Sequence, residues 1–445
     1  MKYCVVGAGP SGLAAAKNLL EHGWDCDIFE RESDLGGVWN IGNTRSTVYQ
    51  SVHMISSKPL TEYTDFPMPK EYPDYPNHRQ ALAYLRAYAD KNRLGSKIRF
   101  RTEVASAHRE AAWDWRVVTR DLATGETRES RYSGLIVASG FNWDPKLPNY
   151  PGSFAGESLH SAQYKTPDLL RGKRVLVIGA GNSGCDIAVE AAQHATAAFH
   201  SVRRGYHYIP KYAFGVPADQ LGEISLRLRV PLVVRRFFNN ILLKMVQGDP
   251  QKFGLPKPDH RLFESHPIIN SQIFYYLGHG DLHAKPNVRE FAGRTVVFQD
   301  GTREEIDLVV YATGYHVTVP YLSDELLNRR EGFPRFHLHV FHPEYDDLAI
   351  IGLIQPDSGV WGLLDCQAQA YVRYAKARRE AQGASIVPPA AAHAKKFARA
   401  KRVQGGEHAL ELGRGIRYLS SSRHIHEVEH FSYRRRLEKL GRDFN

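Results

Sequence analysis

Two short glycine-rich segments carry the clearest chemical signal in this chain. Residues 5–12 read VVGAGPSG, and residues 177–184 read VIGAGNSG. Each segment follows a short apolar run and precedes a stretch of helical character, the setting in which a G-x-G-x-x-G pattern binds a dinucleotide. The glycines permit a tight turn and a close approach of the backbone to a diphosphate, and the helix N-terminus supplies the positive end of its dipole. The sequence therefore predicts two dinucleotide sites.

Residues downstream of each segment indicate which nucleotide binds. The run at 25–30 ends in Glu30, whose carboxylate can accept hydrogen bonds from a free ribose 2′-hydroxyl, which favours FAD or NAD. The run at 200–204 ends in Arg203 and Arg204, whose guanidinium groups match the oxygens of a 2′-phosphate, which favours NADPH. The alternatives are that Glu30 is an ordinary surface carboxylate and that Arg203 and Arg204 are a solvated basic pair.

The composition is that of a globular protein with two or three domains. The chain has 445 residues, of which 42% are hydrophobic and 24% charged. We find no run of eighteen apolar residues, and the first apolar run begins at Lys2, so we expect a cytoplasmic protein without a transmembrane segment or signal peptide. Four scattered cysteines without paired spacing are expected to be free, mostly buried thiols, and no metal site is expected: Cys4, Cys26, Cys185 and Cys366.

The net charge of +10 could attract nucleic acid or an anionic membrane, but a positive field also gathers NADPH, and we expect no nucleic-acid partner. The stretch at 226–238 mixes cations with apolar residues, as an amphipathic helix on a membrane surface does. The favoured expectation is an insertion packed on its own domain, with arginines that extend to the solvent.

The order of the apolar runs predicts an α/β fold with two Rossmann-like domains of three-layer ββα/βαβ type, the second inserted in the first. Residues 135–140 and 308–315 both read as buried parallel strands that end in small residues. We assign both strands to the first domain, because the second strand follows the whole second nucleotide unit. The expected boundaries are residues 1–168 for the FAD-binding domain, 169–288 for the NADPH-binding domain, and 289–445 for the rest of the FAD-binding domain with a C-terminal tail.

Other segments have recognisable local patterns. Prolines and tyrosines at 51–76 predict an ordered loop, and loops of this kind often carry function. Apolar residues at helical spacing predict a helix over 78–93, and alternation predicts strands at 98–104 and 113–118. The charged tail from Ala390 is expected to cover the surface as helices and extended chain.

A segment between the two nucleotide units resembles the identifying motif of the flavin-containing monooxygenases, class B flavoprotein monooxygenases. It contains Phe154, Gly156, His160 and Tyr164 at the family's spacing. In Baeyer–Villiger relatives a tryptophan, followed by proline or aspartate, usually ends this motif, so Tyr164 favours the branch that oxygenates nitrogen and sulfur. Further matches cover nearly the whole chain: residues 36–39 (GGVW), 65–67 (DFP) and 312–315 (ATGY).

The resemblance implies FAD in the first domain and NADPH in the second, with chemistry that belongs mainly to the cofactors. NADPH reduces the flavin, a flavin hydroperoxide forms with dioxygen, and one oxygen atom passes to a soft nucleophile such as an amine or a sulfide, giving an N-oxide or S-oxide. Alternatives are Baeyer–Villiger oxidation of a ketone and a weakly coupled NADPH oxidase that releases hydrogen peroxide. A disulfide reductase shares the layout but needs a redox cysteine pair, and no Cys-x-x-Cys spacing is present. A homodimer is also expected.

The resemblance and the glycine segments together assign the site residues. Cofactor binding is expected of Gly7, Gly9, Pro10, Ser11, Gly12, Glu30, Gly37, Val38, Trp39, Gly179, Gly181, Asn182, Ser183, Gly184, Arg203, Arg204, Thr313, Gly314 and Gln367. Catalytic roles are expected of Ser56, Ser57, Asn182 and Gln367. The chain departs from the family pattern at Ile55, where an asparagine is common. His160 is expected to be a structural joint, because oxygen transfer needs no strong base.

Overall fold

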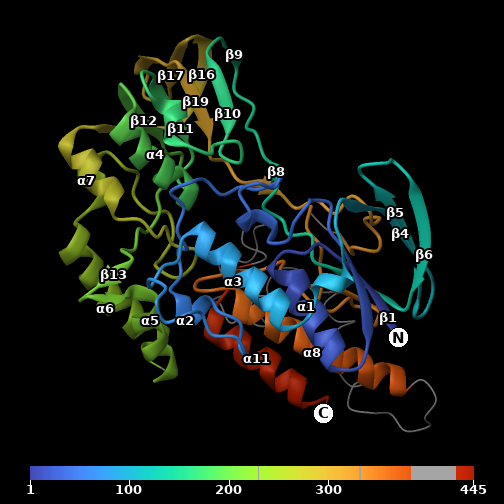
Figure 1. Ribbon diagram of the computed structural model, residues 1–445. Coiled ribbons are helices and arrows are strands. Elements are labelled where there is room, and N and C mark those ends of the chain that lie inside the picture. The colour runs from blue at the N-terminus through green and yellow to red at the C-terminus, as the bar shows by residue number, and fades with distance from the viewer. Residues whose placement is uncertain (229, 330–331, 382–426, 445) are drawn as a thin grey trace. The chain divides into compact units, whose positions relative to one another are not determined.

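The computed structural model describes residues 1–228, 230–329, 332–381 and 427–444, which form two compact units (Figure 1). Unit 1 comprises Met1–Ser46, Ser56–Phe141 and Val317–Asn445, and unit 2 comprises Thr47–Ile55 and Asn142–His316. Both boundaries expected from the sequence, at 168/169 and 288/289, fall inside unit 2. The difference arises from strand pairing, which a local sequence pattern does not show.

Unit 1 is built on a five-stranded parallel sheet with the order β21-β7-β1-β2-β3. Its strands are β21 (Leu348–Ile350), β7 (Gly134–Val137), β1 (Lys2–Val6), β2 (Asp25–Phe29) and β3 (Ile98–Arg99). The central strands are apolar along almost their whole length, because a parallel sheet is covered on both faces. The expected strand at 135–140 is confirmed as β7.

Helices cover this sheet, and the first of them begins at the first glycine segment. α1 (Pro10–Glu21) starts with a proline, whose missing N–H costs nothing at that position. α8 (Trp361–Glu380) packs between α1 and α11 (His430–Arg442). α3 (His78–Lys91) confirms the helix predicted over 78–93, and α2 (Lys58–Thr61) lies in the loop segment predicted at 51–76.

A three-stranded antiparallel sheet completes unit 1. Its strands are β4 (Thr102–Ala111), β5 (Asp114–Asp121) and β6 (Thr127–Tyr132). The strand predicted over 98–104 is divided between β3 and β4, because Arg101 adopts a positive φ of 52° that ends the first strand. Of the C-terminal tail, residues 427–444 are described and contain α11, while the expectation for 390–426 lies outside the described residues.

Unit 2 repeats this plan with a second five-stranded parallel sheet, of order β10-β19-β11-β12-β15. Its strands are β10 (Glu157–His160), β19 (Leu308–Tyr311), β11 (Arg174–Ile178), β12 (Ala197–Ser201) and β15 (Leu282–Lys285). The assignment of 308–315 to the first domain is wrong, since β19 pairs with β10 and β11. β7 and β19 have nearly the same sequence character, so only pairing distinguishes them. The predicted fold class, two Rossmann-like α/β units, is confirmed.

The remaining elements of unit 2 surround this sheet. α4 (Asn182–His194) and α7 (Gln272–His279) are packed together beside it, and a four-stranded sheet contains β9 (Gly152–Phe154), β16 (Val288–Gly293), β17 (Thr295–Phe298) and β18 (Arg303–Glu305). Three further pairs of short strands in the two units are β8 (Asp144–Pro145) with β20 (Tyr315–His316), β13 (Tyr212–Ala213) with β14 (Val216–Pro217), and β22 (Gln355–Pro356) with β23 (Glu427–Val428).

The insertion between β12 and α7 leaves large apolar side chains in the solvent. It contains α5 (Ala218–Arg227) and α6 (Leu232–Gln247), and neither helix has a buried residue. Val233 is 77% exposed, Phe238 63% and Met245 79%. The expected packing on its own domain is confirmed only in part: Arg236 donates to the Leu262 carbonyl at 2.8 Å and pairs with Glu264 of unit 2. The apolar residues occur all round α6, so one packed face cannot cover them. None of the helices in the described ranges is long and apolar enough to cross a membrane.

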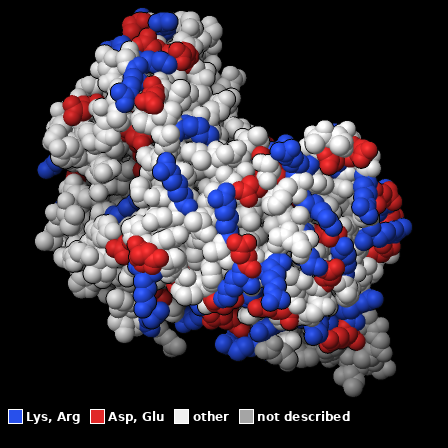
Figure 2. All heavy atoms as spheres, viewed as in Figure 1, with Lys and Arg blue, Asp and Glu red and all other residues white. Residues whose placement is uncertain are grey.

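Charged side chains of both signs are intermixed on the face seen in Figure 2, so the net positive charge is not concentrated in one patch there. Many cations are paired, as Lys97 is with Asp25 and Lys285 with Glu304. All four cysteines are free and buried, as predicted.

Candidate functional site

The first glycine segment forms a tight turn between β1 and α1. Gly7 has a φ of +106°, and a Cβ on Gly12 would lie 1.8 Å from the Gly7 carbonyl oxygen. The Gly7 amide donates to the Phe29 carbonyl at 2.9 Å, which joins the turn to the end of β2. Only glycine fits at positions 7 and 12, because any side chain there would separate the helix from the strand.

Helices α1 and α3 of unit 1 begin differently. Among the described residues, no side chain caps α1, whereas Asn77 and Gln80 form a complete capping box at α3. The first N–H groups of a helix have no partner within the helix, so they need a cap, water or a ligand. A diphosphate at this turn would receive these N–H groups together with the positive end of the helix dipole.

Two glycines from other segments approach this turn. A Cβ on Gly37, in the short 3-10 helix η1 (Gly37–Trp39), would lie 3.2 Å from Cα of Gly9. A Cβ on Gly352, which follows β21 with a φ of +94°, would lie 2.1 Å from Oγ of Ser11. Sequence reasoning predicted Gly37 as a site residue and missed Gly352, although a glycine after a buried apolar strand was the available signal.

Glu30 lies at the end of β2, beside the turn, as expected. Its Oε2 accepts a hydrogen bond from the Ala8 amide at 2.7 Å, and its Oε1 accepts one from the Glu32 amide at 2.9 Å. Burial raises the pKa of the Glu30 carboxyl, although these two amides act in the opposite direction. Each oxygen has a second lone pair, so the carboxylate could still accept from a ribose hydroxyl.

The three residues expected to be catalytic in unit 1 lie in or beside two helices, α8 and α2. Gln367, in α8, is fully buried, accepts from the Gly352 amide at 2.9 Å and donates to the Tyr433 hydroxyl at 2.7 Å. It therefore adjoins the turn through Gly352, with both ends of its amide bonded to protein. Ser56 is 2.8 Å from the Thr61 hydroxyl, and Ser57 is the N-terminal cap residue of α2, so both serines help to form the start of that short helix.

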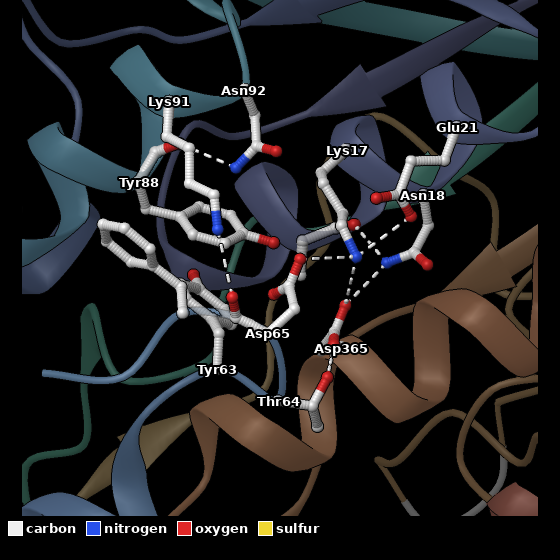
Figure 3. Close-up of polar contacts among 12 residues, drawn as sticks. Lys17, Asn18, Glu21, Tyr63, Thr64, Asp65, Tyr88, Lys91, Asn92 and Asp365 are labelled. Atoms are coloured by element: carbon white, nitrogen blue, oxygen red, sulfur yellow. Dashed lines mark hydrogen bonds and ion pairs between the residues drawn. The ribbon is translucent and has the colours of Figure 1, made fainter.

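A buried polar cluster, which the sequence did not reveal, joins α1 to α8 (Figure 3). Lys17 Nζ lies 3.7 Å from Asp365 Oδ1, 3.0 Å from Glu21 and 3.1 Å from Asp65. Asp365 also accepts from Asn18 Nδ2 at 2.8 Å and from the Thr64 hydroxyl. Burial alone would lower the pKa of Lys17, but the three carboxylates outweigh it and raise that pKa. The cluster fixes α8, and with it Gln367, against the helix that begins at the first turn.

The second glycine segment forms an equivalent turn between β11 and α4. A Cβ on Gly179, which has a φ of +113°, would lie 2.3 Å from the Ala312 carbonyl oxygen, and one on Gly184 would lie 2.0 Å from the Gly179 carbonyl oxygen. By contrast, a Cβ on Gly181 would have no heavy atom within 4 Å. No described side chain caps α4. The open space at Gly181 and the uncapped helix are what a diphosphate requires.

A buried histidine supports this second turn. His200, at the end of β12, donates from Nε2 to the Gly179 carbonyl at 3.0 Å. Burial lowers the pKa of His200 to about 4, and the hydrogen bond to Gly179 opposes that effect only in part. The imidazole is therefore neutral near pH 7, with its proton on Nε2.

Asn182 and Ser183 follow the open glycine, and they differ in their contacts. Asn182 Oδ1 accepts from the Ile269 amide at 2.7 Å, and its Nδ2 lies 3.5 Å from His266 Nε2. The amide of Asn182 thus holds the 266–269 segment at the start of α4. Ser183 is exposed on the first turn of the helix, where a bound diphosphate could reach it.

The two arginines after β12 are not equivalent. Arg203 is exposed and makes no ion pair with any described residue. Arg204 is mostly buried, and its Nη2 lies 3.3 Å from Asp259 Oδ1. The structure therefore places both cations at the end of β12, as predicted, but leaves only Arg203 uncommitted.

The motif residues at 154–164 act as joints within unit 2. His160 donates from Nε2 to the Gly314 carbonyl at 3.1 Å, and its Nδ1 accepts from the Ala162 amide at 3.2 Å. Burial lowers the pKa of His160. Tyr164 is fully buried and donates to Glu190 of α4. These contacts agree with the structural role expected of His160.

Three other predicted residues lie around the same joint. The Phe154 ring packs on Phe291, with ring centres 5.3 Å apart, and a Cβ on Gly156 would lie 2.7 Å from the Asp307 carbonyl oxygen. Thr313 donates to the Lys146 carbonyl at 2.5 Å. Gly314 and Thr313 thus follow β19 next to the second turn, and they belong to unit 2, not to the unit that contains the first turn.

Two parallel sheets, each with an open glycine turn, define a protein that binds two dinucleotides. The family model described as flavin-binding monooxygenase-like matches residues 1–404, and the chain belongs to this family. Dimethylaniline monooxygenase [N-oxide-forming] 2 of Pan troglodytes is 33% identical over 394 residues, which is 84% of this chain and 73% of that protein. Flavin-containing monooxygenase 5 of Mus musculus is 36% identical over 391 residues, 83% of this chain and 72% of its own.

Solved structures share the fold at lower identity. S-allyl-L-cysteine S-oxygenase from Allium sativum superposes with a TM-score of 0.69 at 18% identity, over 99% of this chain and 88% of that one. Cyclohexanone monooxygenase superposes with a TM-score of 0.70 at 20% identity, over 99% and 98%. Family membership makes this chain a flavin-dependent monooxygenase, and its cofactors are FAD and NADPH.

Proposed function

We propose that this enzyme transfers one oxygen atom from dioxygen to a soft nitrogen or sulfur nucleophile, with FAD held by unit 1 and NADPH by unit 2. The observation that carries the proposal is the pair of open, uncapped turns followed by opposite charges, Glu30 after the first and Arg203 after the second. Bound FAD, once reduced by NADPH, supplies the chemistry that activates dioxygen.

In unit 1, the residues of the first turn would hold the diphosphate of FAD. Amides at the start of α1 would donate to phosphate oxygens, and Glu30 would accept from the ribose hydroxyls. Gly9, Gly37 and Gly352 keep the backbone close enough for these contacts, because a larger residue at any of these positions would place a Cβ against the first turn. Gln367 positions Gly352 through the hydrogen bond between its side chain and the Gly352 amide.

In unit 2, the second turn would hold the diphosphate of NADPH. Gly181 leaves the space, Ser183 lies exposed at the helix start, and Arg203 can donate to the 2′-phosphate in a charge-assisted contact. Asn182 contributes by holding the neighbouring segment in place. With FAD in unit 1 and NADPH in unit 2, the FAD-binding parts of the chain would lie before and after the NADPH-binding part in the sequence.

Oxygenation of nitrogen or sulfur is supported by the names of two similar proteins, one called N-oxide-forming and the other an S-oxygenase. The second candidate is Baeyer–Villiger oxidation, since cyclohexanone monooxygenase has the same fold. One residue favours the first candidate: Tyr164 stands where Baeyer–Villiger relatives usually have tryptophan, and it is committed to Glu190. A purified enzyme given a thioether and a ketone in competition should form the sulfoxide and no ester, and an ester as the main product would refute the proposal.

The nucleotide assignment has its own test. Replacing Arg203 with alanine should raise KM for NADPH about tenfold and leave KM for NADH nearly unchanged, because one charge-assisted contact to phosphate is lost. Arg171→Ala is a matched control, since Arg171 is an exposed arginine of unit 2 whose ion-pair partner among the described residues is Asp168. Equal effects on both nucleotides would contradict the assignment of Arg203.

Ile55 bears on the third candidate, a weakly coupled oxidase. If an amide is missing near the reacting flavin, Ile55→Asn should lower the hydrogen peroxide released per NADPH consumed. An unchanged ratio would show that position 55 does not serve this role. A cytoplasmic location and a homodimer stay predictions, which cell fractionation and light scattering would test.

A further inference from the structure

The chain that follows β12 packs directly on a second segment of unit 2. Gly205 pairs with Pro258 in a parallel bridge, and a Cβ on Gly205 would lie 2.1 Å from the Lys257 carbonyl oxygen. Only glycine therefore fits at position 205, and the two segments keep a fixed register. The register brings Asp259 beside Arg204.

Asp259 joins a group of polar side chains around this arginine. Its Oδ1 lies 3.3 Å from Arg204 Nη2 and 2.7 Å from His260 Nδ1. Arg204 Nη2 is also 3.5 Å from His260 Nδ1, and its guanidinium lies 5.0 Å from the centre of the Tyr206 ring. Arg204 is thus oriented by its neighbours, while Arg203 is exposed.

Asp259 occupies a position that matters for the choice of nucleotide. A 2′-phosphate bound by both arginines would bring its negative charge next to the Asp259 carboxylate, and the two negative charges would repel each other. The Asp259 carboxylate also already pairs with Nη2 of the Arg204 guanidinium. The 2′-hydroxyl of NADH carries no charge and can donate to a carboxylate. The Asp259 side chain is 48% exposed, so its pairing with Arg204 is of the modest strength of surface ion pairs.

We propose that Asp259 is a specificity-determining residue, which weakens the preference for NADPH over NADH by competing with the 2′-phosphate for Arg204. The inference rests on the proposed NADPH site in unit 2. It predicts an enzyme that uses both nucleotides, with a smaller NADPH preference than two free arginines would give.

The test compares fragments with and without the phosphate. Binding of 2′,5′-ADP and of 5′-AMP to the full-length enzyme is measured by titration calorimetry for wild type, Asp259→Asn and Arg203→Ala. Asp259→Asn should bind 2′,5′-ADP about fivefold more tightly, the most that a surface ion pair provides, and 5′-AMP within about twofold of wild type. The ratio of kcat/KM for NADPH to that for NADH should rise by the same factor.

Asp168→Asn is the matched control. It removes the same charge from unit 2 at the exposed Asp168–Arg171 pair, so it reports the effect of net charge alone. If Asp259→Asn does not fold, Asp259→Ser removes the carboxylate with a smaller side chain and is measured in the same way.

The outcomes separate this inference from the proposed function. Equal changes for both fragments, or none, would overturn the role of Asp259. If wild type also binds the two fragments equally and Arg203→Ala has no effect, the proposed NADPH site fails as well. If wild type prefers 2′,5′-ADP and Arg203→Ala removes that preference while Asp259→Asn does nothing, the site stands and only the role of Asp259 is refuted.

Discussion

Replacing Lys17 with methionine should destabilise unit 1 strongly, because it removes the cation that faces Asp365 in the buried cluster between α1 and α8 (Figure 3). The Lys17 side chain is 5% exposed, and its partner Asp365 is 3% exposed. Removing one partner of such a pair leaves an uncompensated buried charge and costs about 3–5 kcal/mol. Asp365 keeps two donors, Asn18 and Thr64, so we expect the lower end, about 3 kcal/mol.

The assay is urea unfolding followed by tryptophan fluorescence. Five of the six tryptophans lie in unit 1, so the signal reports mainly on that unit: Trp24, Trp39, Trp113, Trp115 and Trp361, with Trp143 in unit 2. Lys97→Met is the matched control, because Lys97 pairs with Asp25 at the surface of the same unit, where an ion pair contributes about 0–1 kcal/mol.

The double variant Lys17→Met, Asp365→Leu tests the cause. Because it removes the buried carboxylate together with the lysine, it should recover part of the lost stability. The sign of the pH dependence provides a second check. The pKa of Lys17 is raised in the folded state, so its stabilisation is complete below the ordinary lysine pKa of about 10.4 and is lost as the pH rises through the higher folded value. Equal losses for Lys17→Met and Lys97→Met would refute the argument.

Gly181→Ala should fold normally but lose at least about tenfold in affinity for NADP⁺, because its Cβ enters open space that the diphosphate needs. In Gly184→Ala the new Cβ meets the Gly179 carbonyl oxygen, so this variant should fold poorly. Unchanged NADP⁺ binding by Gly181→Ala would exclude the second turn as the site. His200 has a folded pKa of about 4 against an ordinary value of about 6.5. The stability that depends on its neutral imidazole is therefore complete above pH 6.5, and about 3 kcal/mol of the free energy of unfolding is lost as the pH falls to 4. Chemical denaturation at several pH values should show this slope in wild type and not in His200→Gln. Phe237→Ser with Phe238→Ser on α6 should change the melting temperature by less than about 2 °C, since both rings are exposed, and a large drop would show that they are packed.

Local pattern was enough to predict much of unit 1 and the positions of the two glycine turns. The glycine segments specify tight turns because a Cβ at position 7, 12, 179 or 184 would collide with backbone, and this constraint is written in the residue types themselves. Helical spacing predicted α3, and the charges that follow β2 and β12 were found at the strand ends. Features of this kind depend on residues close together in the chain.

Contacts between distant segments decided the rest. The pairing of β19 with β10 and β11, the commitment of Arg204 to Asp259 and of Asn182 to Ile269, and the cluster of Lys17 with Asp365 all join residues far apart in the sequence. Similar apolar runs at 135–140 and 308–315 entered different sheets, because a strand's own residues specify that it is buried but not which neighbour buries it. The sequence by itself determined the two tight glycine turns, because their residue types exclude a Cβ, and the tertiary structure decided which charged and polar groups lie around those turns.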